Sequence, residues 1–171
     1  MKSIACILGL LAMAFLAAGP SCAAETVAVF PFELLDTSQD GELFIKVRPE
    51  ETKRLEVLTG DLQARLGEDK RFELVDTSPL ADEIKTAAPL FKCNGCEVDL
   101  AKKTGAKLAM LGLVQKFSDT LLSVSVQVLD TSTGTVKSSY SAGVQGNTDE
   151  AWLRGLRYIV KNKITNEGSP Q

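Results

Sequence analysis

The sequence predicts one domain of the α/β (α+β) class, with a single mixed sheet of about five strands and three helices in the order β-α-β-α-β-β-β-α. Residues 107–117 form a nearly continuous apolar run, as expected of a strand covered on both faces. Apolar and polar residues then alternate strictly over residues 121–129, and alternate again from 136 to 142. Short Ser, Thr, Asp and Gly turns separate the three segments, so the carboxy-terminal half is predicted to be an antiparallel meander.

Two shorter strands are predicted before the meander, at residues 26–32 and 72–76. Each is adjacent to a helical pattern, so these strands are expected to be parallel neighbours in the sheet. Residues 33–47 show no clean periodicity, residues 36–41 are expected to form an exposed loop, and residues 80–92 are expected to contain at most one short helix.

Three helices are predicted to cover the apolar face of the sheet. The first begins at Pro49, carries acidic residues in its first turn, and has leucine every three or four residues from 55 to 66. The second spans residues 97–103. The third is expected to start at a capping box formed by Asn147 and Glu150 and to run to about residue 164, with Trp152 on its apolar side.

The amino-terminal residues 1–24 are typical of a secretory signal. Lys2 precedes an apolar run of 15 residues, and a Gly-Pro break and small residues follow. A membrane span would need ~20 apolar residues. Lipid attachment at Cys22 is an alternative that the flanking residues disfavour, so we expect soluble export to the periplasm. Residues 25–165 form the expected domain and 166–171 a frayed tail.

Composition excludes several kinds of function. Cleavage after residue 24 would leave 147 residues, with 18 basic and 22 acidic side chains. This mild acidity disfavours nucleic acid as a partner. The chain has no histidine, which removes Ser-His-Asp and Cys-His catalysis and histidine-ligated haem or zinc. We therefore predict no cofactor, no metal and no catalytic residue, and a role without catalysis.

Cys93 and Cys96 would be the remaining cysteines after export, and we expect them to form a disulfide. A redox-active pair is the alternative, because Cys96 directly precedes a helix whose dipole would lower a thiol pKa. Covalent haem attachment would require histidine at position 97, which is Glu97.

Arg154, Arg157 and Lys161 recur at spacings of three and four on the last helix. Such a basic stripe is either a solvated face or a docking surface for an acidic partner.

The element order and the segments VAVFPF, RFELVD and GAKLAMLGLVQKF resemble the α/β domain of two exported proteins, the Tol-system periplasmic protein (its amino-terminal domain) and the curli-secretion lipoprotein. Residues 93–97, 101–106 and 146–155 more closely resemble a proteobacterial family of secreted proteins known as a domain of unknown function. This second resemblance implies an accessory role beside periplasmic quinoprotein alcohol-oxidation systems, and it supplies no catalytic residue.

We therefore expect an exported periplasmic accessory that binds or helps to assemble a protein partner, with no membrane span. Two alternatives stay open. One is a thiol-disulfide or redox accessory acting through Cys93 and Cys96, and the other is a subunit of an envelope assembly or secretion complex.

Overall fold

The computed structural model describes residues 23–38 and 47–165. Nearly all of the expected signal segment, residues 39–41 of the expected loop and the expected tail lie outside the described residues.

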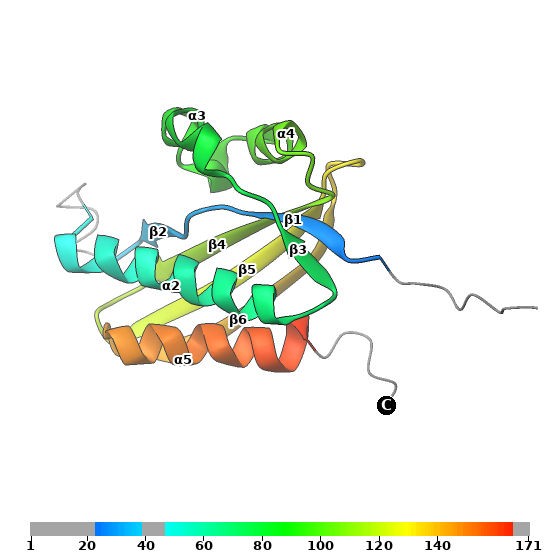
Figure 1. Cartoon of the computed structure of the whole chain (residues 1–171). Helices are drawn as coiled ribbons and strands as arrows, with labels where there is room; N and C mark the ends of the chain where they lie inside the picture. The colour runs from blue at the N-terminus through cyan, green and yellow to red at the C-terminus, as the bar shows by residue number, and fades with distance from the viewer. Residues whose placement is uncertain (1–22, 39–46, 166–171) are drawn as a thin grey trace, which may run out of the picture.

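The described strands form one mixed sheet with the order β3-β1-β4-β5-β6, and β2 pairs with β4 beyond the end of β1 (Figure 1). Strand β1 is parallel to β3 and β4, and β2 is parallel to β4. Strands β4, β5 and β6 are antiparallel neighbours, so the predicted mixed sheet and meander are confirmed. The bounds are Glu25–Val29 for β1, Glu33–Asp36 for β2, Phe72–Leu74 for β3, Leu108–Lys116 for β4, Leu121–Asp130 for β5 and Val136–Gln145 for β6.

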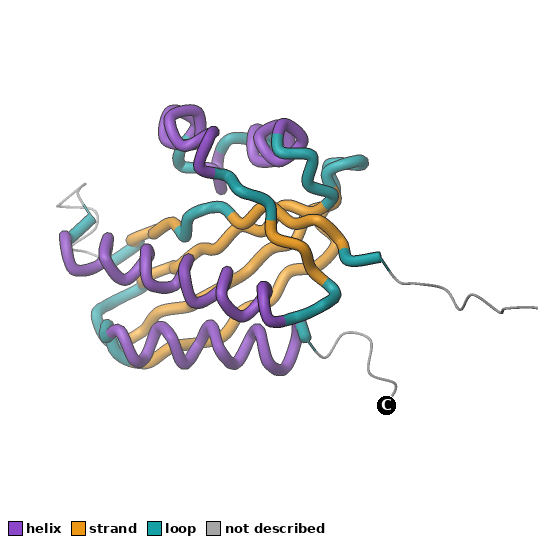
Figure 2. Tube along the Cα trace, viewed as in Figure 1, coloured by secondary structure: helices purple, strands orange, loops and turns teal. Residues whose placement is uncertain are grey.

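Helices lie on both faces of this sheet (Figures 1 and 2). Helices α2 (Pro49–Glu68) and α5 (Asp149–Ile159) lie side by side on one face, and α5 continues as a π-helical turn, Val160–Ile164. Helices α3 (Ala81–Ala87) and α4 (Cys96–Lys103) lie on the other face, with 3₁₀ turns at Ser78–Leu80 and Leu90–Lys92.

The larger core lies between the sheet and helices α2 and α5. The predicted leucine stripe of α2 faces this core, and Leu58, Leu62 and Leu66 are fully buried in it. Trp152 of α5 is also fully buried. Gly155 lets α5 approach β6 closely, because a Cβ atom there would lie 2.6 Å from a methyl group of Val144.

The smaller core lies under α3 and α4 and covers only part of the opposite face. It contains residues of β1 and β4. Strand β5 contributes only Leu129 to it, and β6 contributes no residue. The outward-facing residues of β6 are therefore exposed to solvent: Ser139, Ser141, Gly143 and Gln145.

Strand β2 was not predicted, and it overlaps the expected loop of residues 36–41 only at Asp36. Its four residues pair with the second half of β4, from Glu33 opposite Leu113 to Asp36 opposite Lys116. So short a segment has no readable periodicity, and its partner is about 80 residues away in the sequence. Just before β2, the ring of Phe32 occupies the space over Gly112, where a Cβ atom would lie 2.4 Å from it.

The start of α5 also differs from the prediction. The cap is Thr148, whose hydroxyl oxygen accepts a hydrogen bond from the backbone N–H of Ala151 at 3.2 Å. Asn147, predicted to cap the helix, instead points its amide into a polar cluster described below.

Candidate functional site

The predicted cysteine pair is joined in the structure. Cys93 and Cys96 form a disulfide with their Cα atoms 5.6 Å apart. The turn between them is left-handed at Asn94 (φ 55°) and Gly95 (φ 110°), a conformation that these two residue types adopt most readily. Helix α4 begins at Cys96, so the disulfide closes the entry to that helix, as predicted.

Two carboxylates hold this disulfide turn in place. Glu97 Oε2 accepts a hydrogen bond from the backbone N–H of Gly95 at 3.0 Å and lies 3.0 Å from Cys93 Sγ. Glu33 of β2 accepts hydrogen bonds from the backbone N–H groups of Leu90 (2.7 Å) and Phe91 (3.1 Å). Glu97 therefore fixes the turn that carries the disulfide.

Cys93, Cys96 and Glu97 also bring three potential metal-ligand atoms within 4.8 Å of one another, two sulfurs and a carboxylate oxygen. Metal ions bind cysteine as the thiolate, which a disulfide cannot supply. This arrangement therefore offers a structural crosslink rather than a metal centre while the disulfide is intact.

A hollow of about 290 Å³ separates the disulfide turn from the sheet. Ser125 and Gln127 of β5 and Ser139 of β6 line one side, and Phe91, Asn94 and Glu97 the other. The hollow joins the turn to the uncovered polar face of the meander. We call this surface, formed by Ser123, Ser125, Gln127, Ser139 and Ser141, the open sheet face.

The basic stripe is exposed, but two of its members already face acids. Arg154 is 66% exposed and lies 3.7 Å from Glu150. Arg157 is 51% exposed and lies 3.6 Å from Asp61 on α2. Lys161, on the π-helical turn, borders a separate groove near the end of α2. Docking of an acidic partner on these residues therefore stays a prediction.

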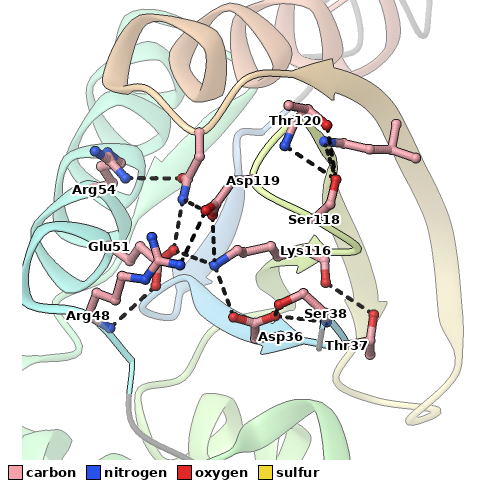
Figure 3. Close-up of polar contacts among 12 residues, drawn as sticks. Asp36, Thr37, Ser38, Arg48, Glu51, Arg54, Lys116, Ser118, Asp119 and Thr120 are labelled. Atoms are coloured by element: carbon pink, nitrogen blue, oxygen red, sulfur yellow. Dashed lines mark hydrogen bonds and ion pairs between the residues drawn. The ribbon is translucent and has the colours of Figure 1, made fainter. Parts of the chain in front are cut away.

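A polar cluster around the buried Lys116 and Glu51, which the sequence analysis missed, lies where β2 and β4 end (Figure 3). At its centre the side chain of Lys116 is only 1% exposed. Its Nζ donates to Glu51 Oε1 at 3.0 Å and lies 3.1 Å from one oxygen each of Asp36 and Asp119. The Asn147 amide donates to Glu51 at 2.8 Å and to Asp119 at 3.2 Å. These five residues are called the Lys116 cluster below.

Two arginines of α2 and its cap surround the Lys116 cluster. Arg48 lies 3.3 Å from Asp119, and its backbone N–H donates to Glu51. Arg54 donates to Asn147 Oδ1 at 3.0 Å and to Asp149 at 2.6 Å. The cluster therefore joins β2, the start of α2, the end of β4, the β4–β5 turn and the loop before α5.

The electrostatics keep the central lysine charged. Burial lowers the pKa of Lys116, but hydrogen bonds to Glu51, Asp36 and Asp119 outweigh burial and raise it overall. The pKa of Asp119 is lowered chiefly by its hydrogen bond with Lys116. Burial raises the pKa of Asp36, but hydrogen bonds from Ser38 and Lys116 outweigh burial and lower the pKa overall. A lysine held protonated is neither a nucleophile nor a base, so these contacts suit a structural ion network.

One signal in the sequence could have located this cluster. Lys116 lies on the same side of β4 as Met110 and Val114, which face the larger core. The inward side of this strand is therefore apolar until it ends at a lysine. Its partners could not be read in the same way, because Glu51 and Asp36 are 65 and 80 residues away.

Residues 25–164 match the model of the DUF3280 family, described as "Protein of unknown function (DUF2380)". The chain belongs to this family. The match covers the whole sheet and all described helices, including the disulfide turn and the Lys116 cluster. Comparison with curated proteins finds no significant match for this DUF3280 chain.

Solved structures share the fold of the DUF3280 chain at low sequence identity. The LpoB C-terminal domain from Escherichia coli is 16% identical with a TM-score of 0.50, over 76% of this chain and 89% of that chain. Lipoprotein GNA1162 from Neisseria meningitidis is 17% identical with a TM-score of 0.52, over 84% and 99%. TolB from Acinetobacter baumannii reaches a TM-score of only 0.46, too low to support the predicted Tol-system resemblance.

These likenesses establish the fold, and the family match establishes a family of unknown function. Among the described residues, every helix is too short or too polar to cross a bilayer.

Proposed function

We propose that this DUF3280 protein is exported to the periplasm and binds a protein partner there as a non-catalytic accessory. The observation that carries the proposal is the open sheet face. Helices α3 and α4 leave it uncovered, although the same two helices bury the neighbouring β1 and β4. Antiparallel sheets commonly leave one face open to solvent, and here that open face is the surface available to a partner.

The chemistry of this face suits a polypeptide partner. Its side chains are small hydroxyls and amides, which donate and accept hydrogen bonds without the desolvation cost of a charge. Along the described chain, β6 pairs with β5 alone, so the other side of this ten-residue strand offers free backbone groups. A partner segment can add to such an edge as a further strand, with side chains reaching the open sheet face.

The disulfide and the Lys116 cluster support this role by fixing the positions of the elements next to the open sheet face. Glu33 links β2 to the disulfide turn, and Lys116 links the end of β4 to α2. The partner can therefore meet a surface that is already ordered, which reduces the entropic cost of binding.

Site-specific photocrosslinking in living cells tests the proposal. A benzoylphenylalanine at Ser139 or Ser141 should give one discrete adduct with an exported protein. The same probe at the exposed Lys53 of α2 or Lys85 of α3 should give none. Ser141→Arg should abolish the adduct formed at position 139 while leaving the melting temperature unchanged. Equal labelling at all four positions, or none at any, would contradict a docking role for the open sheet face.

The identity of the adduct distinguishes the finer hypotheses. A periplasmic oxidoreductase would support service to an oxidation system, and an envelope assembly or secretion component would support the other alternative. Export itself is tested by intact mass of the periplasmic protein. That mass should correspond to a chain starting at residue 24 or 25 with no lipid on Cys22.

A redox accessory is the second candidate, and one observation favours it. Cys96 is half-buried, begins α4, and lines a groove of about 440 Å³ between α3 and α4, so a thiol could approach it. Glu97 beside Cys93 argues for the structural role. Titration against glutathione separates the two, since an exchange-active pair would have a potential near −120 to −200 mV.

A further inference from the structure

A second recess, distinct from the disulfide hollow, lies on the face of the sheet that α2 and α5 cover. Residues at the start of β1 and at the end of the π-helical turn after α5 are among those that line it, and we call it the basal groove. Its volume is about 680 Å³, within the range of roughly 300–1,000 Å³ that is typical of small-molecule sites. It is built from the first residues of β3, β4 and β6, the end of β5 and the last residue of the π-helical turn.

The floor of the basal groove is apolar. Leu108 and Met110 of β4 and Val128 of β5 form its base, and Ile164 closes it from above. Phe72 of β3 and Tyr140 of β6 are half-buried and stand at opposite sides. An apolar body placed here would contact aliphatic and aromatic side chains on several sides, and its burial would favour binding.

The rim of the basal groove is basic. Lys70, Arg71, Lys107 and Lys137 surround it, against one acid, Glu25. Arg71 is held by Asp69 at 2.7 Å and Lys137 by Glu25 at 3.3 Å. Lys70 and Lys107 form no ion pair with any described residue, and both are exposed.

We propose that the basal groove binds a free single-chain amphiphilic anion, such as a fatty acid. Its hydrocarbon body would lie on the floor, and its carboxylate would be held by Lys70 and Lys107. Charge complementarity selects the head group, because two exposed lysines, which form no ion pair within the described part of the chain, line an apolar recess. Several strands of the sheet and Ile164 line this groove, a concave shape that suits one chain rather than a bilayer surface.

Fluorescence titration with 11-(dansylamino)undecanoate tests the proposal, with its methyl ester as a probe of the same body and no charge. The purified periplasmic protein should bind the acid saturably at one site, with a blue-shifted emission, and bind the ester about tenfold more weakly. The variant Lys70→Glu with Lys107→Glu should weaken binding of the acid by about tenfold and leave the ester unaffected. The matched control, Lys53→Glu with Lys85→Glu, has the same net charge and should bind like the wild type.

Ser138→Trp tests the floor independently, since position 138 lines the groove between Lys137 and Tyr140. It should abolish binding of both acid and ester. Far-UV circular dichroism checks that each variant is folded. If Ser138→Trp is unfolded, the charge variants alone decide whether the basal groove binds the acid.

Four results would overturn the proposal. Three concern the titrations: no saturable binding by the wild type, equal affinity for acid and ester, and an equal loss of acid affinity in the control variant. The fourth is sedimentation with phosphatidylglycerol vesicles that depends on Lys70 and Lys107 while the free acid does not bind. If instead the wild type is a dimer that binds no probe, and Ser138→Trp dissociates that dimer, the groove is an interface with a second copy of this chain.

Discussion

Replacing Lys116 by methionine should be among the most destabilising single changes in this chain. Methionine has nearly the same length but no charge, so Glu51, which is 1% exposed, would remain buried without its cation at 3.0 Å. Breaking one side of a buried ion pair typically costs about 3–5 kcal/mol. Domains of this size are stable by only about 5–15 kcal/mol, so a large share of the folding free energy would be lost.

Urea unfolding followed by the fluorescence of Trp152, the single tryptophan, measures this loss. With a typical slope of about 2 kcal/mol per M, the midpoint should fall by about 2 M. Combining Lys116→Met with Glu51→Gln should recover part of the loss, because the unpaired buried charge is then absent. Lys102→Met is the matched control: Lys102 is exposed, lies 4.0 Å from Asp99, and should change stability by less than about 0.5 kcal/mol.

The dependence on pH gives a second test of the same network. The pKa values of Asp36 and Asp119 are lowered from 3.8, so their stabilising effect is complete above that value and is lost as the pH falls through their folded-state pKa. The pKa of Lys116 is raised above 10.5, so its contribution is present below that value and is lost in more alkaline solution. The difference between wild type and Lys116→Met should therefore be smaller at about pH 3 than at about pH 7.

Either of two results would refute this reasoning. A loss below about 1 kcal/mol for Lys116→Met at neutral pH would mean that Glu51 is hydrated or finds another partner in the variant. A difference from wild type that is the same at both pH values would mean that the carboxylates around Lys116 do not depend on it for their charge.

Three further predictions concern the core and the disulfide. Trp152→Ala should lower stability by ~3–5 kcal/mol, whereas Arg154→Ala should change it by less than about 0.5, as measured by thermal melting; similar melting of the two would make α5 peripheral. Gly112→Ala should lower the melting temperature although it adds a single methyl, because that methyl would meet a phenylalanine ring; an unchanged value would show that the ring can move aside. Cys93→Ser with Cys96→Ser should cost roughly 2 kcal/mol without unfolding the domain, and the wild-type disulfide should titrate below about −300 mV.

Local patterns were sufficient for the parts of the fold that depend on neighbouring residues. The alternation of residues 121–129 predicts which side chains of β5 face the core, because side chains of a strand point to opposite faces in turn. The leucine stripe of α2 and the position of Trp152 follow equally from the helical period. The disulfide was predictable because its cysteines are three residues apart, in a turn whose residues tolerate left-handed backbone.

Only the tertiary structure decided the sites assembled from distant segments. The Lys116 cluster gathers a lysine, three carboxylates and an amide from five parts of the chain, and the basal groove combines residues of five strands with the turn after α5. Asn147 shows the difference most directly. Its sequence context predicts a helix cap, yet it binds Glu51, which is 96 residues away. Periodicity specifies the face on which a side chain lies, whereas a buried charge is stable only where folding brings its partners within hydrogen-bonding distance.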